Sequence, residues 1–492
     1  MEQPKTNPHT SWVNILTVIA AGLGSFNFGY ANNVISGSFG EPTFIEKFLS
    51  GPDASARTDG IIGGFLGGAI IGSILQSLIS SAWGRRAATG VAAILFILGN
   101  ALDAGAVHIA MFIVGRVIAG VAGGMTISNC PVYMSEISPP HTRGLLVGLQ
   151  GVCIVWAYII GSALALGFSF VTYEYQWRLN YIVHIFFAVL LLVSIFFLPE
   201  SPRWLAEKGR FDEASAILQR LHRTESDPTG KVANAEMVQI KAQVELEQHL
   251  PRGYLYILRT PSLRKRFICT ALVWTMGQST GMNAIATLTP TLFASLGFDT
   301  TLQLGLSVVW TVCLQIGCII NVSLLDRVGR KRLLVIGGFG SVIILSIEAA
   351  LEKYYLATNY KPGINACVAM YFLVAVWFTA TIECTGYVYG SEIWPTHLRS
   401  YGASITYVAF FINALAYSTP ASTAFANIGW EYYMVFVAVT VPCIIAIIIL
   451  FPETKGLTLE EIAGKFNDTV PITFEDAITA DVAEVPKHDY IQ

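Results

Sequence analysis

Residues 132–143 read V-Y-M-S-E-I-S-P-P-H-T-R, and residues 388–399 read V-Y-G-S-E-I-W-P-T-H-L-R. Val, Tyr, Ser, Glu, Ile, Pro, His and Arg recur in register in these two stretches, which lie 256 residues apart. Shorter echoes also occur, G-R-R with G-R-K (84–86 and 329–331) and P-E-S-P with P-E-T-K (199–202 and 452–455). A repeat of about 250 residues is far longer than a solenoid unit. The chain is therefore expected to consist of two related halves.

The apolar residues are gathered into long runs. Of the 492 residues, 53% are apolar and 13% are charged, whereas roughly a quarter of the residues in soluble domains are charged. A helix that crosses a membrane needs about 20 mostly apolar residues. Twelve segments meet this need: 12–35, 59–79, 87–107, 109–130, 145–169, 177–198, 267–293, 303–325, 333–352, 365–390, 402–424 and 432–451. The sequence predicts an all-α membrane protein with 12 transmembrane helices in two pseudo-symmetric six-helix halves.

Lys and Arg are concentrated on one side of these predicted helices. With both termini in the cytosol, 24 of them lie on the cytosolic side and 5 on the outer side. The opposite orientation would invert this bias, against the rule that cytosolic loops are positively charged. The predicted parts are a cytosolic N-terminus, a first half, a cytosolic linker of amphipathic helices, a second half and a cytosolic tail, at residues 1–11, 12–198, 199–266, 267–451 and 452–492.

Several classes of protein are excluded by composition and motifs. The net charge of −3 does not indicate a nucleic-acid partner. The eight Cys form no C-x-x-C pair, so they are interpreted as small apolar residues rather than as metal ligands or disulfides. The chain has no P-loop, no G-x-S-x-G and no His-rich metal spacing, so we expect no enzyme and no cofactor. Two parallel six-helix halves are typical of a transporter, whose solute site lies near the middle of the membrane between the halves.

The chain also resembles a known family, the sugar porters of the major facilitator superfamily, and is most similar to fungal sugar transporters. The resemblance covers roughly residues 12–465 and is carried by the order and spacing of these motifs: G-Y-A-N-N-V-I-S-G (29–37), S-A-W-G-R-R (81–86), G-R-V-I-A-G (115–120), P-V-Y-M-S-E-I-S-P-P-H-T-R-G (131–144), P-E-S-P-R-W-L (199–205), Q-S-T-G-M-N (278–283), D-R-V-G-R-K-R (326–332), S-E-I-W-P-T-H-L-R (391–399) and P-E-T-K-G-L-T-L-E-E-I (452–462).

This resemblance implies the major facilitator fold and transport of a sugar or a similar polyhydroxylated solute by alternating access. The partners it implies are the small solute, the lipid bilayer and, where transport is coupled, protons. It further implies a monomer in the plasma membrane. A carrier of another metabolite on the same scaffold, such as an organic acid or an exported secondary metabolite, is the alternative. A sugar sensor is a third reading, which the short tail after Pro452 disfavours.

The resemblance also implies an ion-pair network that closes the cytosolic side of the bundle. Its members are Arg85, Glu136 and Arg143 in the first half and Asp326, Arg327, Arg330, Glu392 and Arg399 in the second. The alternative for the arginines is simple anchoring of the topology by positive charge. The family usually has an acid where Ser81 stands here, so we expect the network of the first half to be the weaker one.

Ionisable residues inside the membrane indicate functional sites, because inserting them costs free energy. Arg116 lies about midway along the fourth predicted helix. In proton-coupled sugar porters the matching Arg faces an Asp of the first helix, and Ala31 stands at that position here, so we expect this Asp/Arg proton switch to be absent. Glu383 lies deep in the tenth helix, where it could pair with Arg116, bind solute, carry a proton or serve a structural role. Asp103 and Glu348, near the outer ends of their helices, are interpreted as structural.

A sugar requires amide and hydroxyl partners and an aromatic surface in its site. Gln278 and Asn283 match the second Gln and the Asn of the family pattern Q-Q-x-x-G-x-N. Gln150 lies one residue before the position, Gly151, at which the family's fifth-helix Gln is expected. Asn413 and the aromatic Tyr387 complete the substrate-binding candidates, together with Arg116 and Glu383. The alternative for each amide is a hydrogen bond between helices.

Overall fold

The computed structural model describes residues 11–139, 143–171, 176–222, 227, 230–247, 250–356, 358, 360–455, 457, 462 and 464–466. Helices account for nearly all of this part of the chain, and its elements include no strand. Ten helical stretches within it are long and apolar enough to cross a membrane. The last of these, Arg399–Leu450, contains two of the predicted spans, and the predicted span at 267–293 is divided between two helices.

The first half consists of seven helices in the described residues, namely α1 (Trp12–Gly40), α2 (Pro42–Phe48), α3 (Ala54–Trp83), α4 (Arg85–Ala104), α5 (Ile109–Ile137), α6 (Arg143–Ser169) and α7 (Gln176–Ser194). The second half contains α12 (Pro261–Ser279), α13 (Met282–Ser295), α14 (Thr300–Val328), α15 (Arg330–Tyr355), α16 (Lys361–Phe378), η1 (Thr379–Glu383), α17 (Cys384–Glu392), η2 (Thr396–Leu398), α18 (Arg399–Ser418), α19 (Ala421–Ile428), η3 (Gly429–Glu431) and α20 (Tyr432–Leu450). Short helices α8 (Pro202–Glu207), α9 (Phe211–His222), α10 (Lys231–Glu247) and α11 (Tyr254–Arg259) join the halves.

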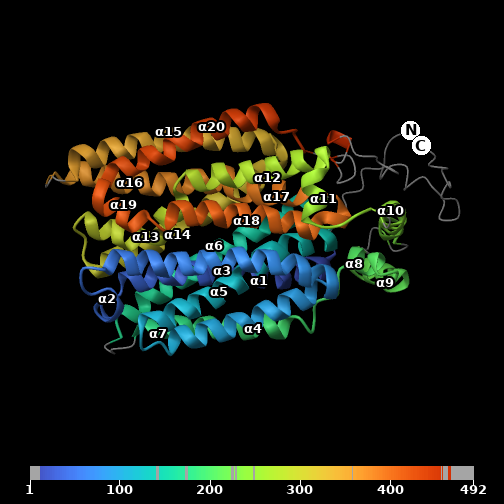
Figure 1. The fold of residues 1–492 in the computed structure, drawn as a ribbon, viewed down its shortest axis with the longest axis horizontal. Helices are drawn as coiled ribbons and strands as arrows, with labels where there is room; N and C mark the ends of the chain where they lie inside the picture. The colour runs from blue at the N-terminus through green and yellow to red at the C-terminus, as the bar shows by residue number, and fades with distance from the viewer. Residues whose placement is uncertain are drawn as a thin grey trace.

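The long helices run roughly side by side, with first-half helices below and most second-half helices above in Figure 1. Helices α8, α9 and α10 lie together at one end of this bundle, which we call the linker end; the end at which α2 lies is the far end. The halves meet mainly where α3 packs against α18 and α6 against α14. Helices are the expected spanning element, because each satisfies its own backbone hydrogen bonds where no water is available.

Glycines allow α3 and α5 to approach closely. A Cβ atom at Gly68 or Gly72 of α3 would overlap the backbone carbonyl of Val117 or Val121, respectively. On α5, a Cβ atom at Gly124 would overlap the carbonyl of Ala69 in the same way. Small residues are what transmembrane helices use to bring their backbones together, since lipid supplies no hydrophobic force between them. Helices α3 and α5 are therefore packed closely against each other.

Candidate functional site

A small cavity lies between the two halves. It is lined by Asn32, Ile35, Ile61, Ile62, Phe65, Leu66, Arg116, Asn283 and Thr287. Its free volume of ≈ 10 Å³ is about the space that one water molecule needs. The lining comes from α1, α3 and α5 of the first half and from α13 of the second, so the cavity lies where a transporter of two halves has its solute site.

Arg116 lines this cavity and is fully buried. Its Nη2 donates a hydrogen bond to the carbonyl of Ala31 at 2.7 Å, and its guanidinium lies 4.4 Å from the ring centre of Phe65. Its Nη1 lies 3.9 Å from Oδ2 of Asp103, which is also fully buried. The acid that accompanies Arg116 therefore comes from α4. The sequence-based pairing of Arg116 with Glu383 is not found among the described contacts, and the interpretation of Asp103 as a merely structural residue missed this ion pair.

Glu383 belongs instead to a group of phenols and amides. The hydroxyl of Tyr387 donates to Oε1 of Glu383 at 2.7 Å, one helical turn away. The ring of Tyr387 packs on that of Trp274, with 5.0 Å between the ring centres. Glu383 also interacts electrostatically with Tyr158, whose hydroxyl accepts a hydrogen bond from Asn32 of the cavity wall at 2.8 Å. Glu383 is thus connected to the cavity through Tyr158 and Asn32.

The remaining predicted amides lie along the contact between the halves. Gln150 is buried and donates to the carbonyl of Ile127 at 3.2 Å and to the hydroxyl of Tyr407, in the other half, at 3.3 Å. Asn283 lines the cavity and donates to Oγ of Ser418 at 3.0 Å. A hydrogen bond between helices is therefore what Gln150 makes here, while Asn283 combines such a bond with a place at the cavity.

Two further amides were predicted on second-half helices. Gln278 is buried near the end of α12, and its Oε1 accepts no hydrogen bond from the described residues. Asn413 of α18 donates to Oγ1 of Thr275 at 3.2 Å and to the carbonyl of Ala409 at 2.8 Å. Of these two, Gln278 has the unused polar atom that a solute hydroxyl could meet.

Contacts between the halves close the bundle on both sides of the cavity. Towards the linker end, the hydroxyl of Tyr254 lies 2.6 Å from Oγ of Ser77 in the first half and 2.9 Å from Oγ of Ser404 in the second. Beside the cavity, Oγ of Ser36 donates to the carbonyl of Ala286 at 3.2 Å, and nearer the far end the hydroxyl of Thr423 donates to Oδ2 of Asp59. These contacts join the halves around the cavity, whose free volume is too small for a solute larger than about one water molecule.

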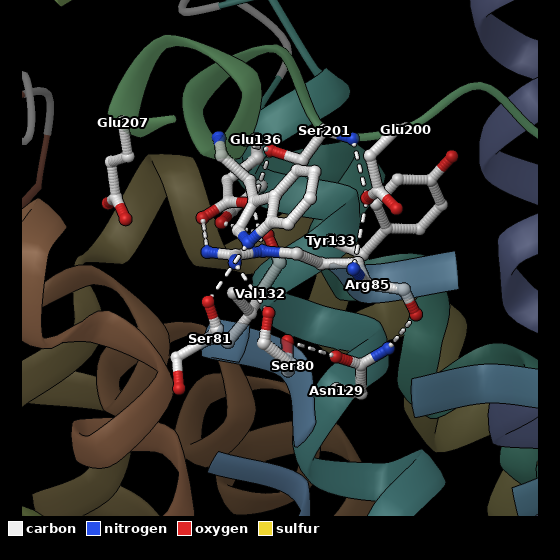
Figure 2. Close-up of polar contacts among 12 residues, drawn as sticks. Ser80, Ser81, Arg85, Asn129, Val132, Tyr133, Glu136, Glu200, Ser201 and Glu207 are labelled. Atoms are coloured by element: carbon white, nitrogen blue, oxygen red, sulfur yellow. Dashed lines mark hydrogen bonds and ion pairs between the residues drawn. The ribbon is translucent and has the colours of Figure 1, made fainter. Parts of the chain in front are cut away.

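At the linker end, Arg85 and Glu136 form the buried ion pair of the first half, shown in Figure 2. Nε and Nη2 of Arg85 donate to the two carboxylate oxygens of Glu136, each at 2.8 Å. The hydroxyl of Ser201 donates to the same carboxylate at 2.6 Å, and Arg399 of the other half interacts with it electrostatically. This network thus joins α4, α5, the start of the linker and α18.

The second half has a corresponding but more open network. Arg330 pairs with Asp326 at 2.9 Å and with Glu392 at 3.1 Å, and the Asp326 side chain is 60% exposed, whereas both side chains of the Arg85–Glu136 pair are at most 3% exposed. The first half thus has one buried pair with two parallel hydrogen bonds, whereas the second has two pairs in which the acids are more exposed. That the first-half network is the weaker one stays a prediction. Arg327 is exposed, its carbonyl accepts from Nζ of Lys455 at 2.6 Å, and the side chain of Arg143 lies outside the described residues.

Two carboxylates that complete these networks were missed from the sequence. Oε1 of Glu200 accepts from the backbone N–H of Arg85 at 2.9 Å, and Oε1 of Glu453 accepts in the same way from Arg330 at 2.9 Å. Each caps the start of a helix, where unpaired N–H groups favour a negative charge. The signal was present, because both acids belong to the repeated P-E motif and both helices start with the repeated G-R motif.

A glycine makes each of these turns. Gly84 and Gly329 precede the two arginines with φ of 97° and 102°, in the region that favours glycine. A Cβ atom there would also crowd the carboxylate of Glu200 or Glu453.

At the far end, Glu41 is a buried carboxyl between α1 and α2. It accepts a hydrogen bond from Nδ2 of Asn180 at 3.0 Å, and the carbonyl of Asn180 accepts from the hydroxyl of Tyr30 at 3.2 Å. Burial, only partly offset by the bond from Asn180, raises the pKa of Glu41 from 4.5 to about 8. The folded protein therefore holds this proton more tightly than the unfolded chain does, and the contribution of Glu41 to stability falls as pH rises from about 4.5 to about 8.

Replacing Glu41 with Gln is expected to remove this pH dependence, since Gln resembles the protonated acid and does not titrate. Melting temperatures of the detergent-solubilised protein measure the effect. Wild type and Glu41→Gln should melt alike at pH 4, below the range in which the contribution is lost, and Glu41→Gln should melt at the higher temperature at pH 8.5. Parallel pH profiles for the two proteins would contradict the assignment.

Comparison with known families and proteins gives one consistent result. Residues 16–466 match the family model described as "Sugar (and other) transporter". The chain is 30% identical to the MFS-type transporter criB of Aspergillus cristatus, over 92% of each chain. It is 31% identical to the arabinose-proton symporter of Bacillus subtilis, over 93% of this chain and 96% of the relative. It is 29% identical to the high-affinity glucose transporter of Kluyveromyces lactis, over 95% of this chain and 87% of the relative.

Solved structures have the same fold. The proton:xylose symporter XylE bound to 6-bromo-6-deoxy-D-glucose matches 92% of this chain and 99% of its own, with a TM-score of 0.80 and 22% identity. The inward-open conformation of the Escherichia coli xylose transporter XylE, at 20% identity and the same coverage, has a TM-score of 0.71. XylE is a protein of the major facilitator superfamily, and the likeness of the two structures to this chain confirms the predicted fold class.

Proposed function

Because this chain belongs to the family of sugar (and other) transporters and has the major facilitator fold, it is a transporter rather than an enzyme, and we propose that it carries a sugar or a related polyhydroxylated solute, bound in the cavity between its halves. The observation that carries this proposal is the composition of the cavity wall. Asn32, Asn283 and Thr287 provide groups that both donate and accept hydrogen bonds, as sugar hydroxyls require.

The apolar part of the wall suits the same class of solute. Phe65 and the neighbouring Ile and Leu side chains offer a surface for the C–H faces of a sugar ring. Six further residues are proposed to contact or orient the solute: Gln278, Gln150, Tyr387, Asn413, Glu383 and Arg116. Relatives named for glucose and for arabinose support a sugar as the solute of this chain as well.

The small volume of the cavity requires the halves to move during transport. A space of about one water molecule cannot hold a sugar, so the halves must separate on one side to admit it and on the other to release it. Contacts at both ends of the bundle then act as alternating gates, and a solute shifts the balance by its different affinity for each state. We propose that two charged networks hold the linker end closed: Arg85, Glu136 and Arg399, and Asp326, Arg327, Arg330 and Glu392. Arg143 is proposed as a further member.

The bias of Lys and Arg towards the linker, 24 against 5, supports a linker end in the cytosol with both termini on that side. The plasma membrane is the proposed location, and a single chain is the proposed working unit, because the cavity and both gates are built from one chain.

A second candidate solute is an organic acid. Arg116 places a positive charge in the cavity wall, which an anion would use, and the relative criB is described only as an MFS-type transporter. The two candidates differ in solute but not in scaffold, so one uptake experiment separates them.

Uptake of radiolabelled hexoses, pentoses, disaccharides, polyols and organic acids in yeast lacking its own hexose carriers tests the proposal, with protein at the cell surface confirmed. Saturable uptake of a sugar or polyol is expected. Uptake of an organic acid alone would replace the solute class, and no uptake of any compound would contradict transport of the proposed solutes.

Asn283→Ala then tests the binding site with the transported sugar. Removing one hydrogen bond to an uncharged partner costs about 1 kcal/mol, so KM should rise roughly fivefold to tenfold with little change in surface level. Asn234→Ala, which removes an exposed amide of α10 far from the cavity, is the matched control and should leave KM unchanged. An unchanged KM for Asn283→Ala would place the solute elsewhere.

A further inference from the structure

The ion pair of Arg116 and Asp103 is buried within the first half, and most of its polar atoms make no hydrogen bond with the described residues. Both side chains are 0% exposed, and the closest approach of their charged atoms is 3.9 Å. Neither carboxylate oxygen of Asp103 accepts a hydrogen bond from the described residues. Nε and Nη1 of Arg116 likewise donate none there, while its Nη2 is held by the carbonyl of Ala31.

Such a pair is unlike the one at the linker end. Glu136 receives two hydrogen bonds from Arg85 and one from Ser201, which together compensate a buried charge. Asp103 has a single cation at a distance beyond hydrogen bonding, so its charge is compensated poorly. A buried carboxylate in this position gains by taking up a proton whenever the cation moves away or finds another partner.

The packing of α4 against α5 leaves room for the carboxylate of Asp103. Gly115 lies directly before Arg116 on α5, and a Cβ atom there would overlap Oδ1 of Asp103. On the same two helices, Gly99 lies against the backbone of Gly115 and Ala119. The α4–α5 contact is therefore shaped to admit the Asp103 side chain beside Arg116.

The groups around the pair come from every helix packed against it. Helix α7 contributes Tyr181, which interacts electrostatically with both charges, and His184, which interacts with Arg116. Glu41, which follows the end of α1, interacts electrostatically with Tyr181. Helix α3 contributes the ring of Phe65, and α1 the carbonyl of Ala31. Among these described groups, Asp103 is the carboxylate nearest to Arg116. The other carboxylate, that of Glu41, accepts a hydrogen bond from Asn180.

Arg116 connects this pair to the solute site, since the same side chain lines the cavity. If Asp103 takes up a proton, the guanidinium loses its counter-charge and becomes a stronger donor towards polar groups in the cavity. If Asp103 releases the proton, the guanidinium is drawn back to it. The charge of Asp103 and the occupancy of the cavity are therefore coupled through one side chain, as linkage requires in both directions.

The repeat supplies an internal comparison. Gly84 and Gly329 lie 245 residues apart, and so do Asp103 and Glu348. Glu348 is likewise buried, but its neighbour is Glu352, which accepts hydrogen bonds from Tyr371 at 2.5 Å and Tyr433 at 3.1 Å. The equivalent acid of the second half thus lies among an acid and phenols, and only the first-half acid is paired with a cation that reaches the cavity.

We propose that Asp103 is the proton-binding residue of this carrier, taking up and releasing one proton in each transport cycle, with Arg116 coupling that proton to the solute. The proposal rests on the proposed function. In the step, an O–H bond forms at a carboxylate oxygen of Asp103 with a proton from water on the side to which the cavity is open. After the bundle opens on the other side, that bond breaks and the proton passes to water there, so charge and atoms balance.

Purified full-length protein in liposomes tests the proposal, with radiolabelled glucose and arabinose as probes. Exchange of labelled for unlabelled sugar, without a pH gradient, measures binding and transport alone. An inward gradient of one pH unit, corresponding to tenfold in proton concentration, drives accumulation of up to about tenfold when one proton accompanies each sugar. Wild type is expected to accumulate sugar, and an uncoupler should abolish the accumulation.

Asp103→Asn is expected to retain exchange and to bring sugar only to equal concentrations inside and outside. Glu348→Gln, the matched buried acid of the second half, should accumulate sugar as wild type does. Asp103→Glu keeps a titratable carboxyl and should accumulate sugar with a shifted pH profile, which covers the case that Asp103→Asn does not fold.

The outcomes separate the two proposals. Exchange by wild type without accumulation overturns the role of Asp103 and leaves the proposed function standing. Accumulation by Asp103→Asn, loss of accumulation by Glu348→Gln, or an unshifted profile for Asp103→Glu also overturns the role of Asp103. A wild-type protein that exchanges neither sugar contradicts the proposed sugar function itself.

Discussion

Replacing Glu136 with Gln is expected to lower sugar uptake at least tenfold and to destabilise the protein. The change leaves Arg85 buried without its carboxylate and takes away the charge that faces Arg399 across the halves. Removing one partner of a buried ion pair costs about 3–5 kcal/mol, because the remaining charge is left uncompensated. Uptake at equal surface level and the melting temperature of the solubilised protein measure the two effects.

Glu213→Gln is the control for this prediction. It breaks the Arg210–Glu213 pair, whose side chains are 51% and 56% exposed on the linker, and exposed pairs contribute little because water and salt screen them. Uptake and melting temperature should be those of wild type. If Glu136→Gln behaved like Glu213→Gln, the linker-end network would have no role in closing the bundle and the charges would serve topology alone.

Replacing Gly72 with Ala is expected to prevent folding of most of the protein, although one methyl group is added. Its Cβ would overlap the backbone carbonyl of Val121, and a backbone carbonyl cannot turn aside as a side chain can. The helices α3 and α5 would have to separate, which loses their packing and displaces both Phe65 and Arg116 from the cavity. Fluorescence-detected size exclusion of a tagged protein measures the folded fraction.

Gly67→Ala provides the matched control, because it makes the same change five residues earlier on the same helix. A Cβ atom at Gly67 meets no atom within 4 Å, and Ala favours a helix over Gly by about 1 kcal/mol. Gly67→Ala should therefore fold as well as wild type or better. Equal yields of the two variants would show that α3 and α5 are less closely packed than the structure describes.

Much of the fold could be predicted from the chain alone. The apolar runs gave the positions of the membrane helices, because a membrane helix must be apolar over its whole length and needs no long-range information. Two features escaped this reasoning. The span predicted at 267–293 is divided at Thr280 and Gly281, and the span at 365–390 contains the π-helical turn Thr379–Glu383. Both breaks depend on how neighbouring helices pack, which local hydropathy does not record.

The candidate site was harder to predict, since successive side chains along a helix point in directions that differ by about 100°, so an error of one residue changes which neighbour a side chain faces. Gln150 was singled out because it lies one residue before Gly151, where the family's Gln is expected, and only the structure shows that it contacts Tyr407 across the halves. Arg116 was identified as the important cation, yet its expected partner was sought on the first helix or at Glu383. Its observed partner, Asp103, lies 13 residues before it on the neighbouring helix.

The sequence by itself determined that this chain is a two-half, all-helical membrane carrier, because repetition, apolar length and the placement of positive charge are properties of the linear order. Only the tertiary structure decided which charges meet. Glu200 and Glu453 close the two G-R turns, Asp103 joins Arg116, and Glu383 joins Tyr387, because buried charges and hydrogen-bonding groups are compensated by whichever partner packing brings within a few ångströms. Such partners are chosen by helix rotation and close approach, and these are fixed only when all helices are packed together.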